Sequence, residues 1–326
     1  MPSRMQNAAD IRQDWNRREV EALMALPFAE LLYRAQTVHR EHFRTDTVEA
    51  CVLLSIKTGG CPEDCAYCAQ SARHAGPAAR GTPMLSVEEV RRAAREAKAR
   101  GATRFCMGAA LRSPKPAHLE RMARMIAAVR TEGLETCLTA GMLTAEQARL
   151  LKTAGLDWYN HNIDTSPEYY PRIVTTRTME DRLQTLRNVR EAGLKVCCGG
   201  IIGMSESRKD RAAMLHLLAT LPEHPESVPV NTLVAMPGTP LKNAAPVDPL
   251  ELVRTIATAR ILMPRSRIRL AAGRQGMSDE LQALCFLAGA NSLFLGERLL
   301  TCDNAAPELD MRLLERLGMR LEPHVS

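Results

Sequence analysis

Three of the ten cysteines in this 326-residue sequence lie within eight residues, as the C-x3-C-x2-C array Cys61, Cys65 and Cys68. Three thiolates on one short loop can bind one metal centre, although structural zinc usually takes four protein ligands. No second Cys or His pair follows closely. Thiolates also bind iron–sulfur clusters, and three cysteines on a four-iron cluster leave one iron free for another ligand. The array therefore favours an iron–sulfur site, with a zinc knuckle or three unligated thiols as the alternatives.

Three further cysteines occupy matching positions in the pattern that follows. Cys137 and Cys197 each lie four residues after a glycine that ends a predicted helix, and Cys106 lies five residues after such a glycine. On the strands of a closed barrel, inward side chains converge near the axis. The pattern therefore predicts that these three thiols meet inside a barrel. The alternative is that each is a small buried side chain, as free Cys often is.

A polar segment with a spacing of two residues ends the fourth predicted strand. Asn160, Asn162 and Asp164 lie on one face if the segment is extended, and His161 faces the other way. Two amides and a carboxylate suit a ligand with both donors and acceptors, such as a ribose or a urea. Turn formation is the plainer explanation for the asparagines. We interpret His161 as structural rather than catalytic.

Alternating strand and helix patterns must position these groups. Apolar runs predict eight strands, at 50–56, 103–107, 134–139, 156–163, 194–202, 227–235, 267–271 and 291–295. Helices are predicted between them, and several begin with a capping box such as Ser86-x-x-Glu89. Strict alternation of this kind predicts a (β/α)8 TIM-type barrel, with an open doubly wound sheet as the alternative.

The domain organisation that we expect is one barrel with extensions. We predict an N-terminal helical cap at residues 1–46, made of two helices broken near Pro27. The barrel core is predicted at residues 47–303 and a C-terminal extension at residues 304–326. A barrel of ~250 residues with extensions fits the length of the chain. No linker argues for a second domain.

Composition limits the classes of partner. The net charge is +6, but acidic and basic residues are interleaved, so we expect no nucleic acid. No apolar run reaches the ~20 residues of a membrane span. The N-terminus lacks an apolar signal segment and carries acidic residues at positions 10, 14, 19 and 21. We therefore expect a cytoplasmic protein without a membrane partner, in which cysteines serve as metal ligands rather than as disulfides.

The cysteine array resembles the signature of the radical S-adenosylmethionine (SAM) superfamily, in which the free iron of a 4Fe–4S cluster chelates SAM. In those enzymes the residue before the third cysteine packs on adenine, and here that residue is Tyr67. The full set of motifs is similar to the biotin synthase family over most of the chain. These motifs lie at 59–70, 104–110, 134–137, 159–167, 195–197, 231, 237–241 and 269–274.

That resemblance implies a homodimeric barrel that inserts sulfur between C6 and C9 of dethiobiotin, with electrons from a flavodoxin-type donor. It implies a 4Fe–4S cluster on Cys61, Cys65 and Cys68. It also implies a 2Fe–2S cluster, the sulfur source, on Cys106, Cys137, Cys197 and Arg269. Asn162 and Asp164 match positions that contact the SAM ribose, and Asn160 and Asn231 match positions that bind the ureido ring of dethiobiotin.

Two small departures and three rival interpretations accompany this resemblance. Ala271 stands where the family usually has serine, and Ser205 where it usually has glycine, which bears on fine SAM contacts.

The rivals are a lipoyl synthase, a hydrogenase-cluster maturase and a non-enzymatic iron–sulfur protein. A lipoyl synthase needs a second N-terminal cysteine array, and residues 1–50 contain no cysteine.

Overall fold

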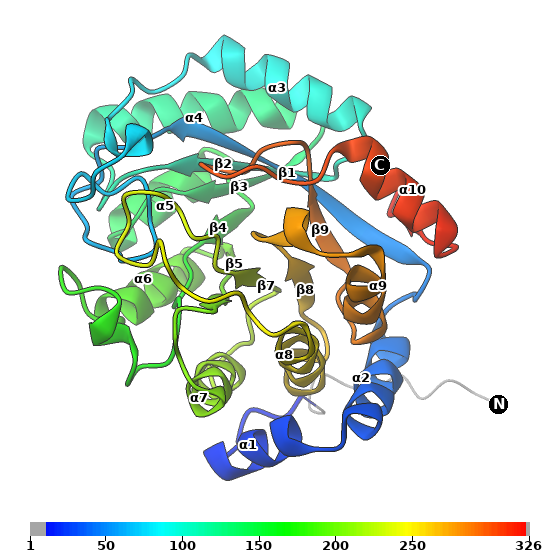
Figure 1. The fold of residues 1–326 in the computed structure, drawn as a ribbon. Coiled ribbons are helices and arrows are strands. Elements are labelled where there is room, and N and C mark those ends of the chain that lie inside the picture. Colours follow the sequence, from blue (N-terminus) through cyan, green and yellow to red (C-terminus); the bar gives the residue numbers. More distant parts are fainter. Residues whose placement is uncertain (1–10, 324–326) are drawn as a thin grey trace.

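Parallel strands close into a barrel in the computed structural model, which describes residues 11–323 (Figure 1). Strand β1 pairs with β2 on one side and with β9 on the other, so the sheet has no gap around the ring. The short strands β5 and β6 follow one another along β7 and together fill one position. The bounds are β1 Thr47–Lys57, β2 Arg104–Ala109, β3 Glu135–Thr139, β4 Trp158–Asn160, β5 Lys195–Cys197, β6 Gly200–Ile202, β7 Ser227–Thr232, β8 Arg267–Leu270 and β9 Ser292–Leu295. The predicted (β/α)8 fold class is confirmed.

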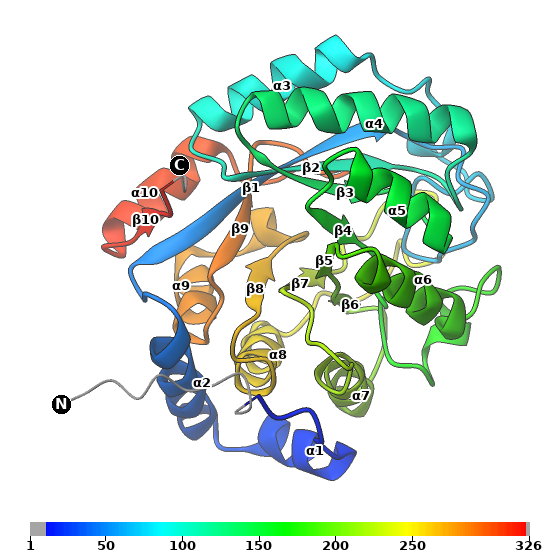
Figure 2. The same cartoon turned by 180° about the vertical axis from the view of Figure 1, so that it is seen from behind.

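A ring of helices covers the outside of the sheet (Figures 1 and 2). Helix α3 begins at the predicted capping box, where the Ser86 hydroxyl accepts the Glu89 N–H and the Glu89 carboxylate accepts the Ser86 N–H. The helices are α3 Val87–Ala99, α4 Pro116–Thr131, α5 Ala145–Thr153, α6 Met179–Glu191, α7 Arg208–Ala219, α8 Pro249–Leu262 and α9 Asp279–Leu287. Each of them lies between two of the predicted strands, as the sequence analysis expects.

The two ends of the chain add elements to the barrel. Helices α1 (Arg17–Ala25) and α2 (Phe28–His42) are separated near Pro27, as predicted, and pack against α7 and α8 (Figure 2). At the other end, α10 (Pro307–Arg316) and the short strand β10 (Arg320–Leu321) are elements that the sequence analysis did not predict. Strand β10 pairs with the start of β1. None of the described helices is both long and apolar enough to cross a membrane.

The predicted strand at 194–202 is interrupted, and the interruption preserves the register. Cys197 of β5 pairs with Ser227 of β7, and Gly200 of β6 pairs with Val230 of β7. The two sides advance by the same number of residues between these pairs, so the register does not shift. A side chain at Gly199 would place its Cβ 2.0 Å from the carbonyl oxygen of Pro229, so the two backbones approach too closely for any larger residue.

Buried apolar residues form a large core between sheet and helices and a smaller cluster inside the ring. Two neighbouring cysteines lie in different clusters. Cys198 belongs to the large outer core, and Cys197 belongs to the inner cluster. Successive side chains of a strand face opposite sides, which explains the division. Cys197 therefore faces the inside of the barrel, and Cys198 faces the helix layer.

Candidate active site

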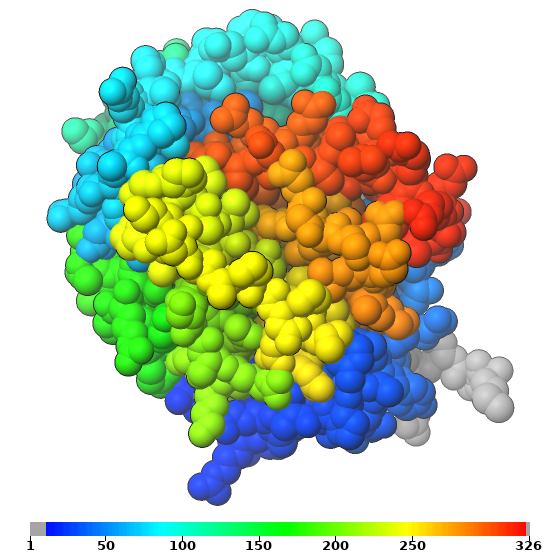
Figure 3. Space-filling view, viewed as in Figure 1, coloured from blue at the N-terminus to red at the C-terminus, as the bar shows by residue number. Residues whose placement is uncertain are grey.

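One cavity of about 320 Å³ lies at the end of the barrel where the strands finish. Segments that follow β7 and β9, including Met236, Leu299 and Leu300, cover it. In the space-filling view these yellow and orange segments lie next to each other across this face (Figure 3). The lining includes every residue that the sequence analysis selected: Cys61, Cys65, Tyr67, Cys68, Cys106, Cys137, Asn160, Asn162, Asp164, Cys197, Asn231 and Arg269.

The first thiol group lies on the loop after β1. The Cys68 N–H donates to the Cys65 carbonyl at 2.9 Å, and the Cys61 N–H donates to the Gln70 carbonyl at 3.1 Å, so the backbone folds the three cysteines toward one side. Gly59 enters this loop with φ +71°, and a Cβ there would meet the Arg80 carbonyl oxygen at 2.1 Å. Glycine is therefore required at the start of the turn.

Two acidic residues inside the array anchor this loop to the segment before α6. Glu63 is buried and accepts a hydrogen bond from Arg112 Nη1 at 2.8 Å. Asp64 accepts N–H groups of Thr175 and Thr176 at 3.0 and 3.2 Å, and it also accepts their hydroxyls. Burial alone would raise the pKa of Asp64, but these hydrogen bonds outweigh it and lower the pKa to about 2. The loop is thus held by side chains as well as by its own backbone.

Burial raises the pKa of all three loop thiols, that of Cys68 to about 12. The charge of Arg177 opposes this effect at Cys65, whose sulfur lies 3.4 Å from Arg177 Nη2. Binding of iron must therefore displace protons from the thiols.

Two arginines that sequence reasoning missed supply positive charge at this end of the cavity. Arg182 is buried and pairs with Asp164, and its Nε donates to the Tyr170 hydroxyl at 3.0 Å. Arg177 also lines the cavity, and its buried Nε has no hydrogen-bond partner in the described structure. A buried donor without a partner is costly, so an anionic ligand here would gain a ready hydrogen bond. Arg182 lies on α6 and Arg177 lies just before it. The packing of this segment against the loop brings both arginines to the cavity, and no spacing in the sequence reveals that contact.

The polar segment after β4 differs in part from its prediction. Asn160 and Asn162 share a face, because Asn160 Nδ2 donates to Asn162 Oδ1 at 3.3 Å. The extended geometry ends before Asp164, which has φ +68°, a left-handed conformation. His161 is buried beside Tyr159 but borders the cavity too, with its Nε2 unpartnered. The predicted alternation therefore ends before Asp164, and the interpretation of His161 as a structural residue stays a prediction.

The second thiol group lies deeper in the barrel. Cys106 and Cys137 are register partners on β2 and β3, and Cys197 packs in the same buried cluster from β5. Asn160 Nδ2 reaches the Cys197 sulfur at 3.2 Å, which connects this group with the polar segment. The predicted meeting of three thiols inside the barrel is confirmed.

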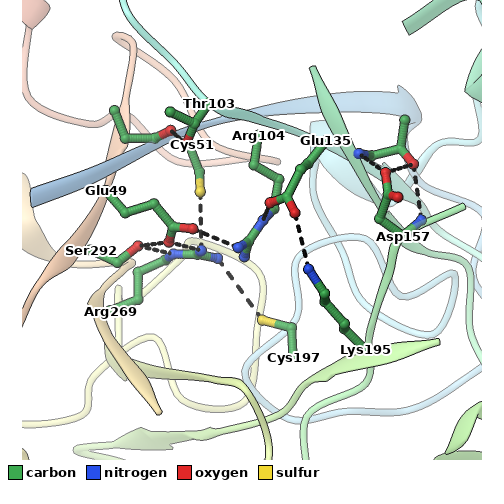
Figure 4. Close-up of polar contacts among 12 residues, drawn as sticks. Glu49, Cys51, Thr103, Arg104, Glu135, Asp157, Lys195, Cys197, Arg269 and Ser292 are labelled. Carbon is green, nitrogen blue, oxygen red and sulfur yellow. Dashed lines mark hydrogen bonds and ion pairs between the residues drawn. The ribbon is translucent and has the colours of Figure 1, made fainter. Parts of the chain in front are cut away.

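Arg269 on β8 completes this inner group through a buried network (Figure 4). Its Nε donates to the Ser292 hydroxyl at 2.8 Å, and its Nη2 donates to Glu49 Oε2 at 3.1 Å. The other Glu49 oxygen accepts from Arg104 Nη2 at 2.5 Å. Burial would raise the pKa of Glu49, but Arg104 and Arg269 lower it to about 2. Arg104 also pairs with Glu135, which in turn pairs with Lys195, so three cations and two carboxylates leave a net charge of +1 in this network.

Both thiol groups have the chemistry that iron–sulfur clusters require: soft sulfur ligands that border one cavity, with positive charge nearby. Within residues 11–323, no three His, Cys, Asp or Glu side chains converge closely enough to hold a single metal ion. The thiolates of a cluster bind different irons and need not converge in that way.

The two departures from the family pattern lie beside the cavity rather than in it. Neither Ser205 nor Ala271 is among the residues that line the cavity. Ser205 has φ +71°, the conformation for which glycine is the usual choice, so serine there costs about 1 kcal/mol. The turn is held instead by the Glu206 carboxylate, which accepts the N–H groups of Gly203 and Met204 at 2.9 and 2.6 Å.

Known proteins share both the fold and the motifs. Residues 55–218 match the model of the radical SAM superfamily, and residues 229–320 match the biotin and thiamin synthesis associated domain. Methylornithine synthase has a similar structure, with a TM-score of 0.79, 19% identity and coverage of 94% of each chain. The FeFe-hydrogenase maturase HydG from Carboxydothermus hydrogenoformans has a TM-score of 0.81 and 18% identity, over 94% of this chain and 76% of its own. Fold and cysteine loop thus define a radical SAM barrel protein.

Sequence relatives narrow the class. The biotin synthase of Nitrosococcus oceani is 63% identical over 310 residues, which cover 95% of this chain and 90% of the relative. That of Methylococcus capsulatus is 60% identical over 311 residues, 95% of each chain. The chain belongs to the biotin synthase family.

Proposed function

We propose that this chain converts dethiobiotin to biotin by inserting one sulfur atom between C6 and C9. The observation that supports the proposal is that two separate thiol groups, on the loop after β1 and inside the barrel, border one cavity. When bound, a reduced 4Fe–4S cluster supplies an electron that cleaves SAM to a 5′-deoxyadenosyl radical, and a 2Fe–2S cluster supplies the sulfur. The chain's own residues hold and orient these groups.

The loop residues would bind the 4Fe–4S cluster and SAM. Cys61, Cys65 and Cys68 supply the thiolates, and Tyr67, which packs in a small cluster with Cys65, offers a ring against which adenine can stack. Asn162 and Asp164 offer an amide and a carboxylate to the ribose hydroxyls. Arg177, with its unpartnered Nε, is suited to a carboxylate such as that of the methionine part of SAM.

The barrel residues would bind the 2Fe–2S cluster and the substrate. Cys106, Cys137 and Cys197 supply thiolates, and Arg269 is the fourth ligand that the family resemblance implies. Asn231 donates to the Gly200 carbonyl at 3.0 Å and accepts the Ala272 N–H at 3.1 Å, so its amide is held rigidly. Asn160 accepts the Thr139 hydroxyl at 3.0 Å. Asn231 keeps a further donor and a lone pair for a ureido ring, whereas Asn160 keeps a lone pair, because its Nδ2 already contacts Asn162 and Cys197.

The covering segments would protect the radical step. A carbon-centred radical must meet its hydrogen source at about 3–3.5 Å and away from water. Met236, Leu299 and Leu300 bring apolar side chains to the cavity from segments that follow β7 and β9. Closure of these segments over the substrate would exclude water while leaving the polar ends of the cavity intact.

The assembly and the electron supply are proposals from family resemblance alone. We propose a homodimer in the cytoplasm that receives electrons from a flavodoxin-type protein. Sedimentation of the cluster-loaded protein tests the proposed homodimer. Replacing a chemical reductant with flavodoxin and its reductase tests the proposed electron donor.

One experiment tests the proposed activity. The anaerobic, cluster-loaded protein is mixed with dethiobiotin, SAM and a reductant, and both biotin and 5′-deoxyadenosine are measured. We expect both products. Formation of 5′-deoxyadenosine without biotin would indicate a radical SAM enzyme that acts on another substrate, and formation of neither would contradict the whole proposal.

A further inference from the structure

A fourth thiol that is not part of the implied ligand set lies beside the inner cysteines. Cys51 on β1 is fully buried and belongs to the same cluster as Cys106, Cys137 and Cys197. It is the β1 residue opposite Arg104, two positions after Glu49. The alternation of β1 places Glu49 and Cys51 on the same face, toward the inside of the barrel. Four thiols from β1, β2, β3 and β5 therefore surround one region.

Cys51 is also in direct contact with Arg269. Nη2 of Arg269 lies 3.0 Å from the Cys51 sulfur, closer than Nη1 lies to the Cys197 sulfur, at 3.9 Å (Figure 4). The same Nη2 donates to Glu49, and Nε donates to Ser292. Nη1 is thus the nitrogen least committed to other partners, and it is directed at the thiol group. Arg269 on β8 and Cys51 on β1 therefore reach the same group of thiols.

The chemistry of the two candidates differs. A guanidinium has five donors and no acceptor, so it can bind iron only after losing a proton. A thiolate is a soft anion, and four cysteine ligands are the commonest set for a 2Fe–2S cluster. The other buried cysteines outside the implied set, Cys198 and Cys285, lie in the outer core, away from this group. Cys302 packs against the inner cluster and lines the cavity, but Cys51 is the cysteine outside the implied set that contacts Arg269. Cys51 is therefore the candidate that the geometry favours.

We propose that Cys51 is a reserve ligand of the two-iron cluster, which binds iron as a thiolate whenever Arg269 does not. This inference rests on the proposed function, because it assumes the cluster at Cys106, Cys137 and Cys197. The exchange is balanced: the iron–nitrogen bond to Arg269 breaks, an iron–sulfur bond to Cys51 forms, and the thiol proton of Cys51 passes to the released guanidine. No oxidant or reductant is needed, and the net charge of the site is unchanged.

Such a ligand has a use in the proposed reaction. A cluster that gave up a sulfide would need another ligand for its iron. Cys51, which is in contact with Arg269 and packs with the other three thiols, could supply that ligand. Cys51 would therefore retain iron in the barrel after sulfur has been donated.

The test compares cluster content and spectra in four variants, Arg269→Met, Cys51→Ser, the double variant and Cys198→Ser. Each is loaded anaerobically with iron and sulfide, and iron, sulfide, absorption and resonance Raman spectra are recorded. We expect Arg269→Met to retain most of its two-iron cluster, with the iron–sulfur stretching pattern of four thiolates. The double variant should lose most of that cluster and keep the four-iron cluster. Cys51→Ser and Cys198→Ser should each resemble the wild type, with Cys198→Ser as the matched control for loss of a buried thiol.

Two results would overturn the proposal. One is loss of the two-iron cluster from Arg269→Met alone, since Cys51 would then not substitute. The other is equal cluster content in Arg269→Met and the double variant, since Cys51 would then not be the substitute. The Raman pattern is measured in the single variant, so the question is answered even if the double variant fails to fold. A wild type without any two-iron signal would instead contradict the proposed function.

Discussion

The two thiol groups of this barrel are built in opposite ways. The loop group takes three cysteines from eight consecutive residues, two of them partly exposed, and its backbone and two acidic side chains fix its shape. The inner group takes its cysteines from β2, β3 and β5, all buried, and exists only when the barrel closes. The loop is therefore a local structure on a scaffold, whereas the inner group is part of the scaffold itself.

This difference decides what a substitution does. A change in the loop removes a ligand and leaves the packing of the barrel nearly intact. A change in the inner group alters packing, charge balance and ligation together, because Glu49, Arg104 and Arg269 share one buried network with the thiols. The largest functional effects with the smallest structural cost should come from the loop.

Replacing Cys61, Cys65 or Cys68 by alanine should have the largest effect. Each supplies one of only three thiolates, so 5′-deoxyadenosine formation should fall to background in every one of the three variants. Circular dichroism and thermal unfolding should remain close to the wild type. Near-normal SAM cleavage by any of them would refute the assignment of the loop.

Replacing Cys197 by alanine should remove the two-iron cluster and biotin formation while SAM still binds at the four-iron site. The matched variant Cys198→Ala should keep both clusters, at a packing cost of about 1 kcal/mol. The comparison is made by iron analysis, SAM binding and biotin assay. Loss of the two-iron signal in the Cys198 variant, with retention in the Cys197 variant, would show that the ligand assignment is reversed.

Much of the fold and of the site was predictable because it depends on short-range signals. Capping boxes, helix-ending glycines and apolar runs repeat with the barrel units, and the thiol array is a motif of eight residues. The inner thiols were also predictable, since Cys106, Cys137 and Cys197 follow a helix-ending glycine by five, four and four residues, which places them at similar heights on their strands. The ligand roles of these residues stay predictions.

The features that sequence reasoning missed depend on contacts between distant segments. Arg177 and Arg182 reach the cavity only because the segment before α6 docks on the loop, and Cys51 meets Arg269 only because β1 and β9 close the ring. The left-handed backbone of Asp164 breaks the alternation that the sequence pattern predicts there. Helix α10 was missed because it lies beyond the repeat, where Asp310 pairs with the buried Arg274.

Replacing Glu49 by alanine should test how far the inner network supports the fold. It leaves Arg104 and Arg269 buried without their shared carboxylate, and breaking a buried pair in this way costs roughly 3–5 kcal/mol. The free energy of unfolding, measured in urea, should therefore fall by roughly 3–5 kcal/mol. The Glu49→Gln side chain keeps one hydrogen-bond acceptor and two donors, so this variant should lose less unfolding free energy than Glu49→Ala. Equal stability of wild type and Glu49→Ala would show that the arginines find other partners.

Asp64 offers the corresponding test in the loop, with a smaller expected effect. Its carboxylate accepts N–H and hydroxyl groups of Thr175 and Thr176 in a partly exposed setting. Asp64→Ala frees donors that water can reach, so the free energy of unfolding should fall by about 1–2 kcal/mol. SAM should bind more weakly because the loop is less constrained, while the inner cluster should keep its iron. Loss of inner iron would show that the two regions are coupled.

The same carboxylate gives the loop a defined pH dependence. The pKa of Asp64 is lowered to about 2 in the folded chain, from 3.8 in the unfolded chain, so its stabilisation is complete above pH 3.8 and is lost as pH falls toward 2. The difference in unfolding free energy between wild type and Asp64→Asn, measured without iron, should therefore be constant from pH 5 to 7 and shrink toward pH 3. Glu49 titrates in both proteins and cancels from the difference. A difference that stays constant down to pH 3 would show that the Thr175 and Thr176 contacts do not hold the loop.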